Sequence, residues 1–228
     1  MKFFLRVLGS LFFSTAMFAL LLLLPAWTWK WERAWLLLGL VAVGTVITMW
    51  VAFRDNEGLY QERKRGLFQK GQPVADKMVL IPFAISFYAQ IVSIGLDVFH
   101  WHLLPRPGPF VSEIGLGMFV AGWALITMVF QVNAFAAPVV KHQQERGHRV
   151  IDTGVYAVVR HPMYTAVAIL LPGMALWLES TAAALFSLVP IALLAVRILV
   201  EEDFLRRELP GYEDYTRRVR WRLVPGIW

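Results

Sequence analysis

Residues 166–200 read AVAILLPGMALWLESTAAALFSLVPIALLAVRILV, and they contain two apolar runs, 166–178 and 182–200, separated by Glu179-Ser180-Thr181. A helix needs about 20 apolar residues to cross the hydrocarbon core of a bilayer, so the second run is long enough and the first is short. Three polar residues suffice for a tight turn between two helices. The stretch therefore predicts a helical hairpin in a membrane.

Four more apolar runs of spanning length precede this hairpin. They cover residues 3–24, 35–53, 79–99 and about 111–131. The composition agrees, because 58% of the 228 residues are hydrophobic and only 17% are charged, whereas soluble domains are about half apolar and about a quarter charged. We predict an all-α fold, a polytopic transmembrane helical bundle of about five to six membrane segments whose last two form the hairpin.

The distribution of positive charge predicts the orientation of these segments. With six crossings and the N-terminus inside, nineteen of the 22 Lys and Arg residues fall on one side, and only Lys30, Arg33 and Arg106 on the other. Lys and Arg accumulate on the cytoplasmic side of membrane proteins. We therefore expect an integral protein of a cytoplasmic (inner) membrane with both termini in the cytoplasm.

Several classes of site are disfavoured by the inventory of residues. The chain has no cysteine, which excludes disulfides, thiolate nucleophiles and Cys-based metal centres, and we expect no metal. The net charge of +6 is explained by topology and anionic lipid headgroups, and no soluble portion is large enough for a nucleic-acid recognition module. Gly115, Gly117 and Gly122 follow no strand, so we interpret them as close helix packing.

A polar stretch, residues 141–156, leads into Arg160-His161-Pro162-Met163-Tyr164 at the start of the hairpin. Proline suits the first turn of a helix. The free amides of that turn, the helix dipole and Arg160 could together attract a carboxylate or phosphate. The alternative is an ordinary helix start with an arginine that reaches to the membrane interface. The residues alone favour the two equally.

The end of the last run carries a second group of charges. Arg197 lies four residues before Glu201, on one helical face, and Glu202 and Asp203 follow. An ionisable residue within a membrane helix is a functional candidate by default. The alternative is a structural Arg197–Glu201 ion pair, with the other two acids exposed to solvent.

At these residues the sequence resembles the isoprenylcysteine carboxyl methyltransferase family, in its shorter prokaryotic branch, a superfamily that also includes phospholipid N-methyltransferases. The resemblance covers about the last 95 residues. It lies in HRVIDTGVY (148–156), RHPMY (160–164), RILVEEDFL (197–205) and the tail GYEDYTRRVRWRLVPGIW (211–228). It implies a four-helix transmembrane region, residues 1–132, and a catalytic region, residues 133–228, made of a cofactor loop, the hairpin and an amphipathic C-terminal cap.

The resemblance also implies a cleft on the cytoplasmic side that holds S-adenosyl-L-methionine. Arg197 matches the arginine assigned to the substrate carboxylate, and with Glu201 it forms the implied catalytic pair. Ala166 stands where the family commonly has glycine, which would narrow the cleft. The implied cofactor-binding residues are Gln143, His148, Arg149, Val150, Ile151, Tyr156, His161, Pro162, Met163, Tyr164 and Glu201.

The implied activity is methyl transfer to a lipophilic acceptor, a small molecule or a prenylated protein, and most simply to its carboxylate. The same architecture serves phospholipid N-methyltransferases and NADPH-dependent reductases of the sterol-reductase type, so both remain alternatives. A transporter or assembly factor would need charged residues inside the first four segments, which are nearly free of charge. Besides membrane lipids, the sequence indicates no further partner and no oligomeric state.

Overall fold

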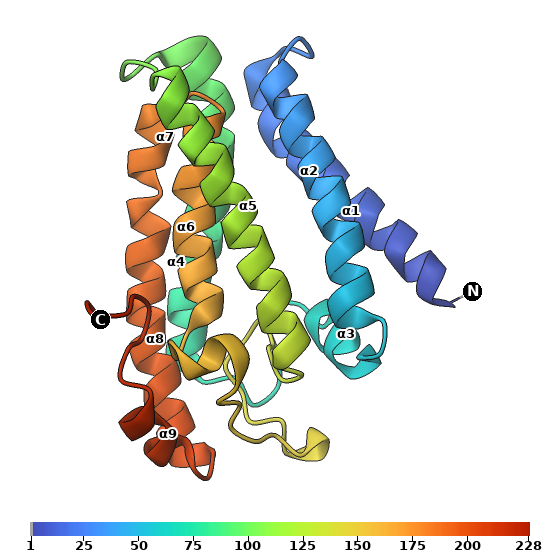
Figure 1. Cartoon of the computed structure of the whole chain (residues 1–228), viewed down its shortest axis with the longest axis vertical. Helices are drawn as coiled ribbons and strands as arrows, with labels where there is room; N and C mark the ends of the chain where they lie inside the picture. The colour runs from blue at the N-terminus through green and yellow to red at the C-terminus, as the bar shows by residue number, and fades with distance from the viewer. Residues whose placement is uncertain (1) are drawn as a thin grey trace.

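The computed structural model describes residues 2–228, and no β-strand occurs in that range. The predicted all-α membrane bundle is confirmed (Figure 1). Its α-helices are α1 (Lys2–Ala26), α2 (Glu32–Thr48), α3 (Glu57–Lys64), α4 (Val74–Leu96), α5 (Pro109–Val132), α6 (Pro162–Trp177), α7 (Thr181–Phe186), α8 (Leu188–Glu208) and α9 (Tyr212–Arg218). The shorter helical elements are η1 (Met49–Phe53), η2 (Asp97–Trp101), η3 (Gln144–Arg146) and η4 (Gly154–Ala157).

Five helical stretches are long and apolar enough to cross a membrane: α1, α2 with η1, α4 with η2, α5, and α7 with α8. The sixth segment, α6, has 16 residues and is thus only about 24 Å long. Two segments extend furthest beyond their predicted limits. The third begins at Val74 instead of residue 79, and the last continues to Glu208 instead of residue 200.

The hairpin turn lies where the sequence places it. Glu179 adopts a positive φ of 70°, and the Ser180 hydroxyl accepts a hydrogen bond from the Ala183 N–H at 3.0 Å, which caps α7. The second arm is not one helix, because α7 ends before Ser187 and α8 begins after it. Pro190 lies in the first turn of α8, where its missing N–H costs no hydrogen bond.

Glycines bring α5 and α6 into close contact. A Cβ on Gly115 would lie 2.8 Å from the Gly173 carbonyl oxygen, and a Cβ on Gly122 would lie 2.8 Å from that of Ala166. The prediction of small-residue packing is therefore right for these two positions. It is wrong for Gly117, which has no atom within 4 Å of a built Cβ.

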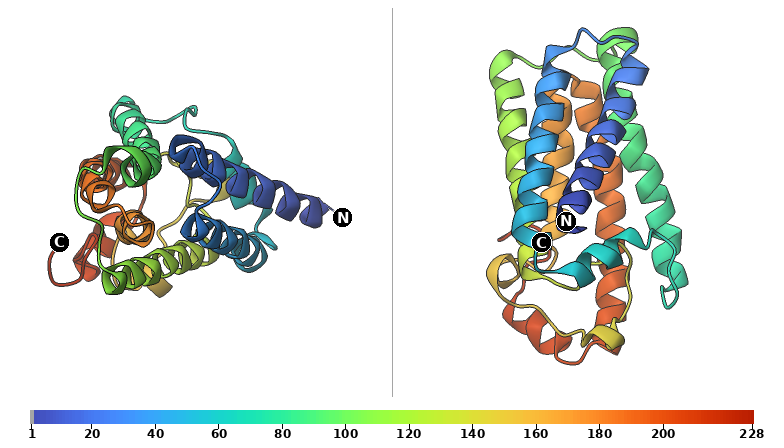
Figure 2. Two further views of the ribbon diagram at one scale, coloured as in Figure 1. Left: turned by 90° about the horizontal axis from the view of Figure 1, so that it is seen from above. Right: turned by 90° about the vertical axis from the view of Figure 1, so that its right-hand side faces the viewer.

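The hairpin of α1 and α2 lies to one side of the bundle formed by α4, α5, α6 and α8 (Figures 1 and 2). At one end of this bundle lie α3, the irregular segment 133–161 and α9. At the other end, the buried Asp97 accepts a hydrogen bond from the Ser180 hydroxyl at 2.7 Å. The third segment, predicted to be nearly free of charge, therefore contains one buried acid. Asp97 has a structural partner in the hairpin turn, the Ser180 hydroxyl.

Candidate active site

A cavity of about 320 Å³ lies where the segment 133–161 meets α4, α6, α8 and α9. This size is within the range of roughly 300–1,000 Å³ of small-molecule sites. Its walls are of two kinds. Apolar side chains such as Phe83, Phe87 and Leu194 come from the spanning helices, whereas most of the charged groups come from the irregular segment and the end of α8.

Most of the residues implied by the resemblance line this one cavity. The backbone from residue 133 to 161 is irregular, with single turns at η3 and η4, and this lets it wrap around the ends of the helices. It thereby brings residues far apart in the sequence together. The lining includes His148, Arg149, Val150, Ile151, Tyr156, His161, Met163, Tyr164, Arg197 and Glu201.

Two implied residues do not line the cavity. Gln143 is buried and serves the loop, since its side-chain amide donates to the Phe135 carbonyl at 2.7 Å and its oxygen accepts from Arg146. Pro162 occupies the first position of α6, as its ring favours. Ala166 is also absent from the lining. It is fully buried and its carbonyl faces Gly122 of α5, so it does not narrow the cavity as expected.

Arg197 is paired with an acid that the sequence did not single out. Its Nε donates to Asp76 Oδ1 at 2.9 Å, and its Nη2 donates to the Pro138 carbonyl at 2.8 Å. Asp76 is fully buried and accepts two further hydrogen bonds, from Gln72 at 2.7 Å and from the Val140 N–H at 3.1 Å. The alternative of an Arg197–Glu201 pair is wrong, because Asp76 neutralises Arg197.

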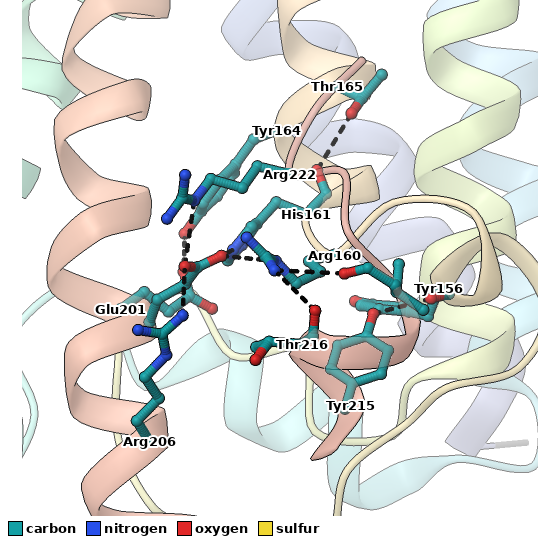
Figure 3. A network of polar contacts seen from close by, with 12 residues as sticks. Tyr156, Arg160, His161, Tyr164, Thr165, Glu201, Arg206, Tyr215, Thr216 and Arg222 are labelled. Carbon is teal, nitrogen blue, oxygen red and sulfur yellow. Dashed lines mark hydrogen bonds and ion pairs between the residues drawn. The ribbon is translucent and has the colours of Figure 1, made fainter. Parts of the chain in front are cut away.

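Glu202 is the centre of a buried charge network, and its partners Arg160, His161 and Arg222 are labelled in Figure 3. Its Oε1 lies 2.8 Å from Arg160 Nε and 3.2 Å from His161 Nε2, and its Oε2 lies 3.1 Å from Arg222 Nε. The Arg160 N–H is not aligned for a hydrogen bond, so this contact is ionic. Arg160 is therefore buried and compensated. It neither reaches to the membrane interface nor stands free to attract an anion, and Glu202 is not exposed to solvent.

The segment 219–228 holds the turn before α6 in place. The N–H groups of Arg160 and His161 donate to the carbonyls of Trp221 and Arg222 at 2.9 and 3.0 Å. The Thr165 hydroxyl donates to the Leu223 carbonyl at 2.8 Å (Figure 3). The C-terminal cap thus supports the stretch Arg160–Tyr164 from behind. Its mixture of basic and aromatic residues did not reveal this role.

Glu201 remains available inside the cavity. Its Oε2 accepts a hydrogen bond from the Tyr164 hydroxyl at 2.5 Å, and no cation lies in salt-bridge range of it among residues 2–228. Close by in the lining, the buried Tyr212 hydroxyl has no hydrogen-bond partner in that range. An unsatisfied buried hydroxyl is costly, so a polar ligand group would be favoured here.

His148 is held neutral in the loop that lines the cavity. Burial, followed by the positive charge of His142 and Arg146, lowers the pKa of His148 to about 4. Its ring packs on Phe135, with centroids 4.7 Å apart, and its Nδ1 accepts from the Gln143 N–H at 3.4 Å. Burial likewise raises the pKa of the Tyr212 hydroxyl. Both groups are therefore uncharged at neutral pH.

Sequence reasoning missed the contributions of α3 and of the first turn of α4. Glu62 of α3 forms a buried ion pair with Lys141 at 2.5 Å, and Arg63 lines the cavity. Both were overlooked because they lie outside the apolar runs. The helix α3 is short and polar, and Asp76 lies before the apolar core of its segment. The one available signal was an acid three residues before a membrane run, at Asp76.

The chain was compared with known proteins. Residues 111–210 match the model of the family "Phospholipid methyltransferase". Protein-S-isoprenylcysteine O-methyltransferase B of Arabidopsis thaliana is 26% identical over 145 residues, which are 62% of this chain and 70% of that protein. A probable protein-S-isoprenylcysteine O-methyltransferase of Oryza sativa subsp. indica is 32% identical over 114 residues, or 48% of this chain and 59% of the rice protein.

The structure of the eukaryotic intramembrane Ras methyltransferase, an isoprenylcysteine carboxyl methyltransferase, has a similar fold. The TM-score is 0.54 at 18% sequence identity, and the match covers 98% of this chain and 84% of that one. The likeness thus extends through the helices before residue 111, which the family model does not reach. The chain is thus similar in sequence to phospholipid and isoprenylcysteine methyltransferases over part of its length, and nearly its whole length shares the fold of the isoprenylcysteine carboxyl methyltransferase.

Proposed function

We propose that the chain transfers a methyl group from S-adenosyl-L-methionine to the carboxylate of a lipophilic acceptor, at the cytoplasmic face of a membrane. The observation that carries this proposal is one cavity with an apolar wall from spanning helices and a polar wall from the segment 133–161 and α8. Such a cavity suits a charged ligand from the aqueous side together with a lipid-like ligand from the bilayer.

The residues present fit the proposed cofactor. Within the described chain, Glu201 has no cationic partner and Tyr212 has an unpartnered buried hydroxyl, so the site offers acceptors and a donor to a ligand with an ammonium group and hydroxyls. The loop 148–151, Tyr156 and the turn at His161 would hold it. When bound, the cofactor supplies an electrophilic methyl group on a sulfonium.

The chain's own residues need only position the acceptor. A carboxylate is already a nucleophile, so no general base has to remove a proton from it. Arg197 would orient that carboxylate through the guanidinium N–H groups that Asp76 and Pro138 leave free. Correct positioning alone can supply about 7–11 kcal/mol towards a reaction barrier. The apolar wall would exclude water from the reacting atoms.

Thermal unfolding of the detergent-purified protein with S-adenosylhomocysteine tests the proposal. At 100 times its dissociation constant, this ligand should stabilise the protein by about 2.7 kcal/mol. Arg197→Ala should abolish turnover but retain this stabilisation, whereas His161→Ala should weaken it. Stabilisation by NADPH, with no effect of S-adenosylhomocysteine, would contradict the proposal and favour a reductase.

The match to the phospholipid methyltransferase model favours a second candidate, methylation of a lipid amine. Both candidates share the donor and differ in the acceptor. A radiolabelled methyl transferred to phosphatidylethanolamine vesicles, with none transferred to a prenylated cysteine, would support this second candidate. Methyl transfer in the opposite pattern supports the carboxylate acceptor.

A further inference from the structure

The positive charges around the cavity are not all compensated. Arg197 is neutralised by Asp76 at 2.9 Å, Arg160 by Glu202 at 2.8 Å and Lys141 by Glu62 at 2.5 Å. Arg63 also lines the cavity, and among residues 2–228 no Asp or Glu lies in salt-bridge range of it. A positive charge without a carboxylate partner in a largely apolar cavity calls for an anion from outside the chain.

The Arg63 guanidinium is held firmly at this place. Its Nη1 donates to the Ala136 carbonyl at 3.1 Å, and its central carbon lies 4.3 Å from the centroid of the Phe130 ring. No other hydrogen bond of its side chain is found within residues 2–228, so most of its five donors are free. Burial lowers the pKa of Arg63 to about 10, which leaves the side chain charged at neutral pH.

Arg63 and Arg197 line the same cavity and are held by the same segment of the chain. The two guanidinium groups are anchored on the carbonyls of Ala136 and Pro138, two residues apart in one segment. The charge of Arg197 contributes to the lowered pKa of Arg63, which reflects their proximity. Arg197 can offer only part of its fork, because its Nε is engaged by Asp76 and one Nη2 donor by Pro138.

We propose that Arg63 binds the anionic head group of the acceptor together with Arg197, and that this pair makes the site selective for anionic acceptors. This inference rests on the proposed function, because it assigns the acceptor of the same cavity. Arg63 comes from α3, Leu67 from the loop that follows it, and Leu80 and Phe83 of α4 continue the wall with apolar groups. A lipophilic chain with a terminal carboxylate matches this arrangement, in which a charged group lies next to an apolar wall.

The test compares two ligands that differ only in charge, N-acetyl-S-farnesylcysteine and its carboxamide. Their binding to the detergent-purified full chain is measured at pH 7 without any methyl donor. We expect the wild type to prefer the carboxylate by about 10- to 100-fold, the usual effect of a hydrogen bond to a charged group. Arg63→Gln should lose most of this preference, and Arg63→Lys should retain part of it because it keeps the charge.

Lys64→Gln is the matched control, because Lys64 is the exposed next residue of α3 and lies outside the cavity lining. It should keep the wild-type preference. Equal affinity of the wild type for the two ligands, or binding of neither, overturns the inference without any need for a folded variant. So does an Arg63→Gln protein that still prefers the carboxylate.

A separate measurement distinguishes this inference from the proposed function. Thermal stabilisation by S-adenosylhomocysteine should be the same in Arg63→Gln and in the wild type. If the variant loses this stabilisation and keeps its acceptor preference, Arg63 binds the carboxylate of the donor and the inference is wrong. If the wild type shows no stabilisation, the methyl donor is misassigned, while the comparison of the two acceptor ligands still decides the role of Arg63.

Discussion

Arg197 of α8 donates from Nε to Oδ1 of Asp76 on α4 at 2.9 Å, across a sequence separation of 121 residues. Both side chains are buried, with 7% and 0% of their surfaces exposed. The pair joins the third spanning segment to the last, beside the cavity. Because the pair is neutral overall, Arg197 offers a ligand its remaining N–H donors but no uncompensated charge, which is why a second cation matters.

Asp76→Asn should destabilise the protein by about 3 kcal/mol, because it leaves the Arg197 guanidinium buried without a counter-charge. The measurement is chemical unfolding in detergent, followed by tryptophan fluorescence. Asp55→Asn is the control, since Asp55 is exposed and forms no ion pair within residues 2–228. Equal stability of the two variants would show that the pair contributes little.

Gly115→Ala should destabilise the α5–α6 contact by about 1–3 kcal/mol, because the new methyl group would lie 2.7 Å from the Trp177 backbone nitrogen. Gly117→Ala, two residues along the same helix, meets no atom within 4 Å. It should be neutral or stabilising, since alanine is the better helix former. Thermal midpoints of the two variants give the comparison, and a drop in both would contradict the packing argument.

The stability of the protein should fall as the pH is lowered from about 6.5 to about 4, in part through His148. Its pKa is about 4 in the folded state, mainly because of burial, and about 6.5 when unfolded. Between these two pH values the unfolded chain binds one proton more at His148 than the folded chain does. The contribution of His148 to stability therefore rises with pH in this range and is constant above it. Allowing for partial exposure, we expect about 1–2 kcal/mol from this residue.

Chemical unfolding at pH 4.5 and at pH 7 measures this effect. The loss at low pH should be smaller in His148→Asn than in the wild type. His102→Asn, a change at an exposed histidine on the other end of the bundle, should keep the full wild-type loss. Asparagine suits the left-handed backbone of His102, which has a φ of 50°. An identical pH dependence in all three proteins would rule out His148.

Glu202→Gln should destabilise the protein by about 3 kcal/mol and weaken the binding of S-adenosylhomocysteine, because Arg160 and His161 lose the carboxylate that orients them. Ligand-induced shifts of the thermal midpoint report the second effect. Asp203→Asn is the neighbouring control, since Asp203 is exposed and, among residues 2–228, pairs only with Arg207 at 2.7 Å. A Glu202→Gln protein with unchanged ligand shifts would limit Glu202 to a structural role.

Much of the fold could be predicted from the sequence because membrane helices are encoded locally. Runs of about 20 apolar residues and the polar turn at Glu179-Ser180-Thr181 locate the crossings without knowledge of their neighbours. The limits of α4 and α8 were missed because hydropathy does not mark them. Each helix continues into polar residues whose helical state depends on tertiary partners, such as Asp76 and Glu202, and not on hydropathy.

The candidate site could be predicted only in part. Motifs close in sequence, such as residues 148–151 and 160–164, identify part of the cavity wall. The ion pairs do not follow from spacing. Arg197 and Glu201 are neighbours on one helical face, yet Arg197 pairs with a residue 121 positions away. Which acid neutralises which base is decided by the packing of α3, α4 and α8, and no local pattern records it.

The backbone hydrogen bonds from Arg160 and His161 to Trp221 and Arg222 have a consequence for a shortened chain. The residues that fix this turn follow the last spanning helix, α8, in the sequence. A chain cut after α8 would therefore keep every spanning helix and still lack the backbone carbonyls that hold the turn before α6, so the cavity wall depends on a segment that lies outside the spanning helices.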